Sequence, residues 1–171
     1  MADRIWAPWR LAYIERATPS GGCIFVDLPA QDRDRENLIL YRGETAFVML
    51  NAFPYTNGHL MVAPYRHTAD LDDLEDAELL EIHVLVAAAI RWIREAYQPN
   101  GFNIGVNLGS AAGAGIPDHV HWHVVPRWNG DTNFMTSIGD VRVMPQSLVD
   151  SYDRLRPIAE RLGTARKERR S

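Results

Sequence analysis

Three histidines alternate with apolar residues in the segment 119–125, which reads His-Val-His-Trp-His-Val-Val. Successive side chains of a β-strand point to opposite faces, so a strand here places His119, His121 and His123 together on one face. A neutral imidazole in such a row can attack phosphorus and form a phosphoramidate, while its neighbours orient it and move protons. The attacking ring needs one unprotonated nitrogen, and we expect a hydrogen bond from its other nitrogen, for example to a backbone carbonyl, to fix that tautomer.

The same spacing is also compatible with a metal site, because imidazoles two residues apart on a strand can bind zinc. A catalytic zinc also needs outer partners and often a carboxylate. Asp118 is the nearby candidate, and strand alternation points it away from His119. The pattern therefore favours catalysis, with a zinc hydrolase as the alternative. The isolated histidines His67 and His83 are interpreted as packed or surface residues.

The loop immediately before the histidines carries almost no side chains. It runs Gly-Ser-Ala-Ala-Gly-Ala-Gly over residues 109–115. Glycine lets the backbone turn its N–H groups toward an oxyanion and approach it closely. A glycine loop alone is most often a plain connection. Its position directly before the histidine row instead predicts an anion site beside the imidazoles.

The remaining pattern predicts the elements that position these residues. Short apolar runs separated by turn residues indicate an antiparallel meander. Apolar residues at spacings of three and four, after an acidic start, predict one long helix. The chain should therefore form an α+β fold with an antiparallel sheet of about five strands, one long helix and a C-terminal helix. The expected strands are 38–41, 46–50, 59–63, 102–108 and 119–125, and the expected helices are 76–97 and about 146–162.

Length and composition fit one domain over residues 1–171, with an N-terminal arm over about 1–36 and a frayed basic tail over about 163–171. The single cysteine, Cys23, allows no internal disulfide, and no apolar run approaches a membrane span. We therefore expect a cytoplasmic protein without a membrane partner. The net charge of −4 provides no global attraction to nucleic acid, so phosphate must be bound locally.

The histidine row followed by Pro126-Arg127 resembles the signature of the histidine triad (HIT) superfamily. The resemblance extends to the segments 47–62, 102–109 and 128–135, and so covers most of residues 6–148. It is strongest toward a bacterial branch near the dinucleoside polyphosphate hydrolases and phosphorylases. The resemblance implies a HIT-like fold and a nucleotidyl hydrolase or transferase that acts on the α-phosphate of a substrate such as diadenosine tetraphosphate.

Roles for the three histidines follow from this resemblance. His121 would be the nucleophile that becomes nucleotidylated. His123 would contact the transferred phosphate and help to orient the nucleophile, and His119 would lie near the leaving group. Water or inorganic phosphate would then release the nucleotide from His121.

The resemblance also implies a substrate-binding set on either side of the triad. Asn51 offers a hydrogen-bond donor and an acceptor to a ribose, and Met61 offers an adaptable apolar wall to a base. Structural alternatives remain open, because Asn51 could close the turn after its strand and Met61 could belong to the core. The implied set is Asn51, His59 and Met61 at the nucleoside, and Asn107 with the backbone of Ala114 and Gly115 at the phosphate oxygens.

The sequence departs from the family pattern in two places. Many members carry Cys-x-x-Cys near the N-terminus as part of a zinc site. This chain has the first cysteine, Cys23, but Val26 stands at the position of the second. We therefore expect no bound metal and no cofactor, although magnesium could arrive with a polyphosphate substrate. Many members also place glutamine or serine four residues before the triad, where this chain has Gly115, which leaves the leaving-group preference open.

Two further expectations complete the interpretation. The alternative to an enzyme that acts on dinucleoside polyphosphates is a nucleotide-binding regulatory protein with slow or incidental phosphoramidase activity. The resemblance also implies a homodimer, in which the long helix over 76–97 and the central strands of two subunits pack together.

Overall fold

The computed structural model describes residues 22–131 and 146–165 of the chain. Most of the predicted N-terminal arm and the end of the basic tail lie outside the described residues. Within the described part, five strands form an antiparallel sheet in the order β1-β2-β3-β5-β4. The predicted α+β class with a five-stranded antiparallel sheet is confirmed.

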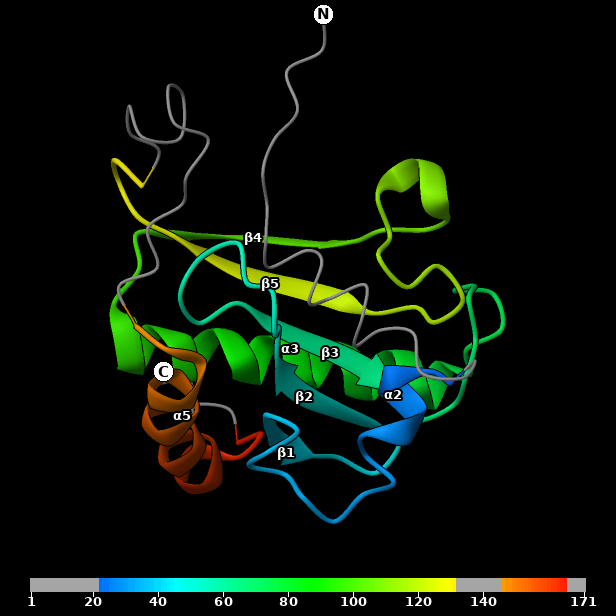
Figure 1. The fold of residues 1–171 in the computed structure, drawn as a ribbon, viewed down its shortest axis with the longest axis horizontal. Helices are drawn as coiled ribbons and strands as arrows, with labels where there is room; N and C mark the ends of the chain where they lie inside the picture. Colours follow the sequence, from blue (N-terminus) through cyan, green and yellow to red (C-terminus); the bar gives the residue numbers. More distant parts are fainter. Residues whose placement is uncertain (1–21, 132–145, 166–171) are drawn as a thin grey trace, which may run out of the picture.

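The predicted meander forms one side of this sheet (Figure 1). It consists of β1 (Ile39–Arg42), β2 (Ala46–Leu50) and β3 (Leu60–Pro64). The other side consists of β4 (Gly101–Val106) and β5 (Trp122–Arg127), with β5 inserted between β3 and β4. This insertion places His123 opposite Met61 of β3 and opposite Gly105 of β4.

Two long helices support the sheet. The helix α3 spans Asp76–Tyr97, the range expected from the sequence. A capping box between Glu75 and Glu78 satisfies backbone N–H groups at its start. The helix α5 spans Leu148–Leu162 and packs against α3 and β1, and the Ser147 hydroxyl accepts the backbone N–H of Asp150 at its start.

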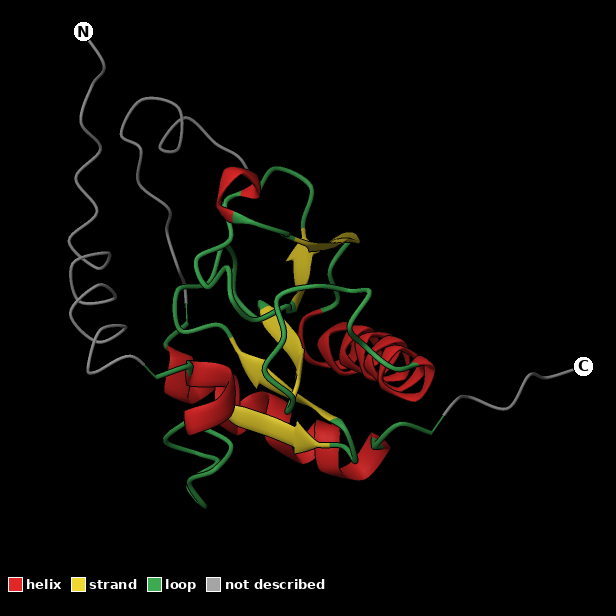
Figure 2. Ribbon diagram, turned by 90° about the vertical axis from the view of Figure 1, so that its right-hand side faces the viewer, coloured by secondary structure: helices red, strands yellow, loops and turns green. Residues whose placement is uncertain are grey.

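The two faces of the sheet have different roles. The face toward α3 carries the larger core cluster, which includes Val120, Trp122 and Val124. The opposite face carries a smaller cluster built around Phe25, from the short helix α2 (Ile24–Asp27), with strand residues such as Met61. Figure 2 shows the sheet between α3 and α2. The apolar residues between the histidines therefore face the main core, as the alternation predicts.

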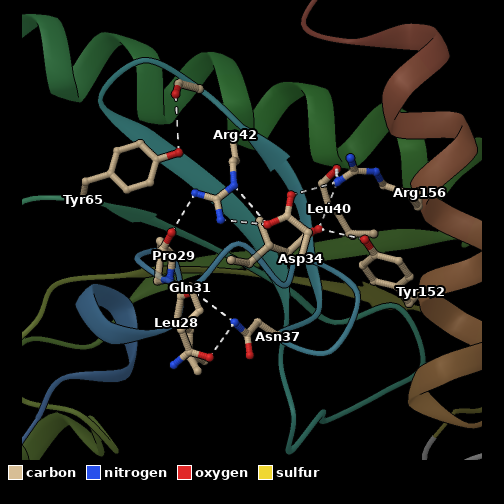
Figure 3. A network of polar contacts seen from close by, with 12 residues as sticks. Leu28, Pro29, Gln31, Asp34, Asn37, Leu40, Arg42, Tyr65, Tyr152 and Arg156 are labelled. Carbon is tan, nitrogen blue, oxygen red and sulfur yellow. Dashed lines mark hydrogen bonds and ion pairs between the residues drawn. The ribbon is translucent and has the colours of Figure 1, made fainter.

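A polar network attaches α5 and the loop before β1 to the edge of the sheet (Figure 3). The Arg156 guanidinium donates to the carbonyls of Ile39 and Leu40 at 3.1 and 3.2 Å, and lies 3.5 Å from Asp34. Asp34 also accepts two hydrogen bonds from Arg42. These contacts satisfy backbone acceptors on β1 that have no further strand beside them in the described sheet.

Apart from shifts of one or two residues at the ends of elements, the structure differs from the sequence-based expectation at three places. The strand predicted from His119 begins only at Trp122, because the backbone N–H of Val120 bonds to the Thr68 carbonyl instead of extending the ladder to β3. The helix α2 was not predicted, and a short 3-10 helix, η1 (Ser110–Ala112), occupies part of the glycine loop. Within the described residues, every helix is too short or too polar to span a membrane.

Candidate active site

The three histidines of the triad lie on one face of the segment that enters and begins β5. The rings of His121 and His123 meet edge to face with their centroids 4.9 Å apart. The Phe25 ring of α2 lies against His119 and His121, with centroid distances of 5.1 and 4.7 Å. Although the regular strand begins only at Trp122, the alternation of side chains extends back to His119.

The middle histidine is held in one tautomer by its own backbone. The Nδ1 atom of His121 lies 2.8 Å from the carbonyl oxygen of His119. Because a carbonyl only accepts hydrogen bonds, Nδ1 carries the proton and Nε2 keeps its lone pair. Burial lowers the pKa of His121, which is 4% exposed, and so favours the neutral ring. This is the hydrogen bond expected of a nucleophilic imidazole.

A chain of hydrogen bonds fixes the third histidine. The backbone N–H of Tyr55 donates to Nδ1 of His59 at 3.1 Å, so the proton of a neutral His59 ring lies on Nε2. That Nε2 lies 2.9 Å from Nδ1 of His123 and donates to it. The proton of a neutral His123 ring is therefore on Nε2, where it can be donated to a phosphate oxygen.

Burial keeps both rings of this chain neutral. Desolvation, with smaller contributions from neighbouring histidines, lowers the pKa of His59 to about 3 and that of His123 to about 4. The exposed Tyr55 ring covers this end of the triad, with its centroid 4.7 Å from that of His59 and 6.0 Å from that of His123. The His123 end is thus a neutral, donor-bearing site beside an accessible aromatic ring.

The first histidine of the triad has different neighbours. The Nε2 atom of His119 lies 3.0 Å from the carbonyl oxygen of Pro64, and its Nδ1 atom lies 3.2 Å from the sulfur of Cys23. Burial lowers the pKa of His119 to about 4. The ring of His67 lies 5.4 Å from that of His119. This end of the triad therefore brings together a thiol and two imidazoles.

The residues implied at the nucleoside lie near the His123 end. The side-chain oxygen of Asn51 accepts the backbone N–H of Phe53 at 2.9 Å, so this residue does close the turn after β2. Its amide nitrogen lies 3.4 Å from Nδ1 of His59. His59 is fully buried and has both ring nitrogens in contact with the protein, and Met61 is 5% exposed within the smaller core cluster. The site roles of these residues remain predictions.

The residues implied at the phosphate lie after β4. Asn107 is half-buried directly beyond the end of that strand, and Ala114 and Gly115 follow η1. Gly109 and Gly113 have φ angles of +75° and +83°, which side-chain-bearing residues rarely adopt. The glycines therefore give this loop a backbone course that other residues would resist. Binding of phosphate by the loop remains a prediction.

Among the described residues, one group has the ligand types and proximity of a metal site. The ligand atoms of Cys23, His67 and His119 all lie within 4.8 Å of one another. The sequence interpretation placed His67 among ordinary packed or surface histidines and expected no metal at Cys23. A zinc site formed by all three triad histidines is disfavoured, because Nδ1 of His123 accepts a hydrogen bond and its Nε2 carries the proton, and because the free lone pair of His119 faces Cys23.

Sequence reasoning did not identify the neighbours of the triad that come from distant segments. Phe25 lies in the region interpreted as an arm, and Tyr55 was interpreted as part of a turn within the segment 47–62 that resembles the family, with no contact to the triad assigned to it. The donation from His59 to His123 joins residues 64 positions apart, and no local pattern indicates it. The apolar residues 24–26, directly after Cys23, were the available signal for the docking of α2 on the sheet.

Comparisons with known proteins agree with this geometry. The HIT domain pattern matches residues 32–130. A Mycobacterium tuberculosis protein named AP-4-A phosphorylase is 43% identical over 157 residues, covering 87% of this chain and 80% of the relative.

Two solved structures are also similar. The crystal structure of a Zn-bound histidine triad family protein from Mycobacterium smegmatis has a TM-score of 0.67 and 29% identity, covering 86% of this chain and 100% of the other. A member of the HIT family from Bacillus subtilis has a TM-score of 0.58 and 25% identity, covering 86% and 99%. The resemblance seen in the sequence is confirmed, and this chain belongs to the HIT domain family.

Proposed function

We propose that this protein is a nucleotidyl hydrolase or transferase that acts on the α-phosphate of a dinucleoside polyphosphate similar to diadenosine tetraphosphate. The observation that carries the proposal is the 2.8 Å hydrogen bond between Nδ1 of His121 and the carbonyl of His119. It leaves Nε2 as a neutral nucleophile at the centre of the triad. The relative named AP-4-A phosphorylase supports the dinucleotide class of substrate.

In the first step, Nε2 of His121 attacks the α-phosphorus. The new N–P bond forms as the bond from phosphorus to the bridging oxygen breaks, and the leaving group departs with that electron pair. For diadenosine tetraphosphate the leaving group is ATP and the covalent intermediate is AMP on His121. The His119 carbonyl stays hydrogen-bonded to Nδ1–H and stabilises the positive charge that the ring acquires.

In the second step, an oxygen nucleophile attacks the same phosphorus and the N–P bond breaks. The electron pair returns to Nε2 of His121, and the nucleotide is released. Attack by inorganic phosphate yields ADP, whereas attack by water yields AMP. The name of the M. tuberculosis relative favours phosphate as the acceptor.

His123 and the glycine loop are the groups that we assign to the phosphoryl oxygens. The donation from His59 leaves the Nε2 proton of a neutral His123 available to an oxygen of the transferred phosphate. Asn107 and the backbone of Ala114 and Gly115 would hold the remaining oxygens, while Asn51, His59 and Met61 shape the nucleoside side. Tyr55 adds an exposed ring on which a base could stack.

A nucleotide-binding regulatory protein with slow or incidental phosphoramidase activity is the second candidate. It is favoured by the close cover of the nucleophile, because His121 is only 4% exposed beneath the buried Phe25 ring. A regulator would bind nucleotide tightly and turn over slowly with every substrate tested. Single-turnover and steady-state rates measured on the same preparation distinguish the two candidates.

We also propose that the protein is a homodimer. The edge strand β4 has an exposed middle section that includes Ile104, and Leu108 lies just after the strand; these two residues are 48% and 43% exposed. Within residues 22–131 and 146–165, β4 pairs with β5 alone, and an exposed edge strand of this kind favours pairing with another chain. Analytical ultracentrifugation checks this proposal directly, and a monomer at micromolar concentration would contradict it.

The decisive experiment is product analysis with diadenosine tetraphosphate, in the presence and absence of inorganic phosphate. Wild-type protein is compared with His121→Ala and with His83→Ala, which changes an exposed histidine outside the site. We expect ADP and ATP with phosphate, or AMP and ATP with water alone, for wild type and His83→Ala but not for His121→Ala. Two molecules of ADP formed in water would contradict attack at the α-phosphate.

A trapping experiment tests the covalent step separately. Substrate labelled at the α-phosphate should transfer its label to wild-type protein on rapid quenching. The bond should be stable to base and labile to acid, as phosphoramidates are. Turnover without label on the protein, in a quench fast enough to precede release, would contradict the intermediate while leaving the substrate class intact.

A further inference from the structure

A single peptide group connects the nucleophilic histidine to the segment that follows β3. The carbonyl of His119 accepts from Nδ1 of His121 at 2.8 Å, and the backbone N–H of Val120 donates to the carbonyl of Thr68 at 2.7 Å. This carbonyl and this N–H belong to the same peptide group, which is planar and trans. The His121 ring and the Thr68 carbonyl therefore hold opposite ends of one rigid unit.

The ladder between β5 and β3 does not fix this peptide group. The strand β5 begins at Trp122, which pairs with Val62 of β3, so the peptide between residues 119 and 120 lies before the ladder. A peptide group outside a ladder can still rotate about the φ and ψ bonds on either side of it. The hydrogen bond to Thr68 takes the place of the ladder and fixes the direction of the His119 carbonyl.

Thr68 is held in place by its own side chain. It is 8% exposed, and its hydroxyl donates to Oδ2 of Asp73 at 3.0 Å. The backbone carbonyl of Asp73 accepts from the Arg66 guanidinium, which also donates to Glu78 in the first turn of α3. The carbonyl that holds Val120 is therefore tied, through Asp73 and Arg66, to the long helix.

The same groups can respond to charge on the nucleophile. When Nε2 of His121 bonds to phosphorus, the ring becomes positive and its Nδ1–H becomes a stronger donor to the His119 carbonyl. Hydrogen bonds in a chain polarise one another, so the N–H of Val120 then donates more strongly to Thr68. The Thr68 carbonyl thus stabilises the positive ring through the peptide group.

We propose that Thr68 is a positioning residue for the nucleophile, which keeps the proton of His121 on Nδ1 and stabilises the positive ring of the covalent intermediate. It acts through the peptide group between His119 and Val120, and Asp73 supports it by binding the Thr68 hydroxyl. The inference rests on the proposed nucleotidyl transfer by His121.

Steady-state kinetics of conservative variants test this role. Thr68→Val removes the hydroxyl and keeps the branched shape, so the carbonyl is no longer held in one direction. We expect kcat for diadenosine tetraphosphate to fall by roughly three- to tenfold with little change in KM, as for the loss of one hydrogen bond. Asp73→Ala should give a similar loss, and Thr68→Ser, which keeps the hydroxyl, should remain near wild type.

A matched control separates positioning from a general loss of structure. Thr45→Val also removes a threonine hydroxyl, but this hydroxyl bonds to Glu81 of α3. It should leave kcat unchanged even where it lowers the free energy of unfolding. Equal losses of kcat in Thr45→Val and Thr68→Val would overturn the proposal.

The tautomer of His121 provides a readout that does not require turnover. Nitrogen-15 NMR of histidine-labelled protein distinguishes protonated from unprotonated ring nitrogens, and the spectrum of His121→Ala assigns the His121 signals. Wild type, Thr68→Ser and Thr45→Val should carry the His121 proton on Nδ1 alone. In Thr68→Val a fraction of His121 should carry it on Nε2, while the His59 signals stay as in wild type.

Two further results would overturn the proposal. One is an unchanged His121 tautomer in folded Thr68→Val, and the other is a rise in KM with kcat intact. Failure of wild-type protein to cleave diadenosine tetraphosphate, with the tautomer change present in Thr68→Val, would instead contradict the proposed function and support the effect of Thr68 on His121.

Discussion

The Nε2 atom of His59 lies 2.9 Å from the Nδ1 atom of His123 and donates its proton to it. The direction is set by Tyr55, whose backbone N–H donates to the other nitrogen of His59. His59 therefore acts on the site through His123, whose remaining N–H it turns toward the substrate. This relationship makes His59 a positioning residue, and its replacement has a characteristic kinetic consequence.

We expect His59→Phe to lower kcat by roughly tenfold or more while changing KM little, because the tautomer of His123 is no longer fixed. His59→Gln should restore part of the rate, since its amide can donate to His123 and accept from Tyr55. Steady-state kinetics with diadenosine tetraphosphate measure both. Equal losses in the two variants, or a rise in KM alone, would contradict a positioning role.

The lowered pKa values predict the dependence of stability on pH. His59 and His123 have pKa values of about 3 and about 4 in the folded protein, against 6.5 for an unperturbed histidine. Below 6.5 the unfolded chain therefore takes up protons that the folded chain does not, and the free energy of unfolding falls as the pH decreases toward 4. Above pH 6.5 these rings are neutral in both the folded and the unfolded chain, so the free energy of unfolding keeps its full value there.

Thermal unfolding measured from pH 8 to pH 4 checks this dependence. Carboxylates also contribute at the acid end, so the diagnostic interval is the decrease in Tm between about pH 6.5 and pH 5. His59→Gln should reduce that decrease, while His83→Ala, at an exposed histidine, should leave it unchanged. An unaltered curve for His59→Gln would show that His59 does not contribute.

Gly58 is required by the turn that presents His59. Its φ angle is +76°, and a Cβ at this position would lie 2.9 Å from Cε2 of Tyr97. Gly58→Ala should therefore destabilise the protein by about 1–3 kcal/mol through backbone strain and the clash. Gly101→Ala is the matched control, because its Cβ would meet no atom within 4 Å. Chemical denaturation measures both, and similar values for the two variants would contradict the argument.

Arg156 fastens α5 to β1 through the carbonyls of Ile39 and Leu40. Arg156→Ala should cost about 1–2 kcal/mol of the free energy of unfolding, because these acceptors lose their charged donor. Arg35→Ala removes an ion pair to Asp153 whose side chains are 59% and 51% exposed, and should therefore destabilise the protein less than Arg156→Ala. Urea denaturation measures the loss in the free energy of unfolding for both variants. Equal losses would show that Arg156 contributes no more to stability than an exposed ion pair does.

The sequence by itself determined the features that depend on local periodicity. The period of two in 119–125 assigned three histidines to one face and the apolar residues to the core, because side chains alternate along extended backbone. The period of 3.6 defined the helix Asp76–Tyr97 within its observed limits. A hydrogen bond from His121 to a backbone carbonyl was also expected, and the structure identifies the acceptor as the carbonyl of His119, two positions away.

The tertiary structure decided everything that depends on distant segments meeting. Cys23, His67 and His119 become neighbours only because α2 docks on the sheet face beside the triad and β5 inserts next to β3. His59 meets His123 through the same insertion, and its complete burial sets its pKa. Sequence spacing encodes local geometry, whereas the convergence of distant side chains and their desolvation follow from packing of the whole chain. The sequence therefore showed the three histidines of the triad but not the residues that hold them in place.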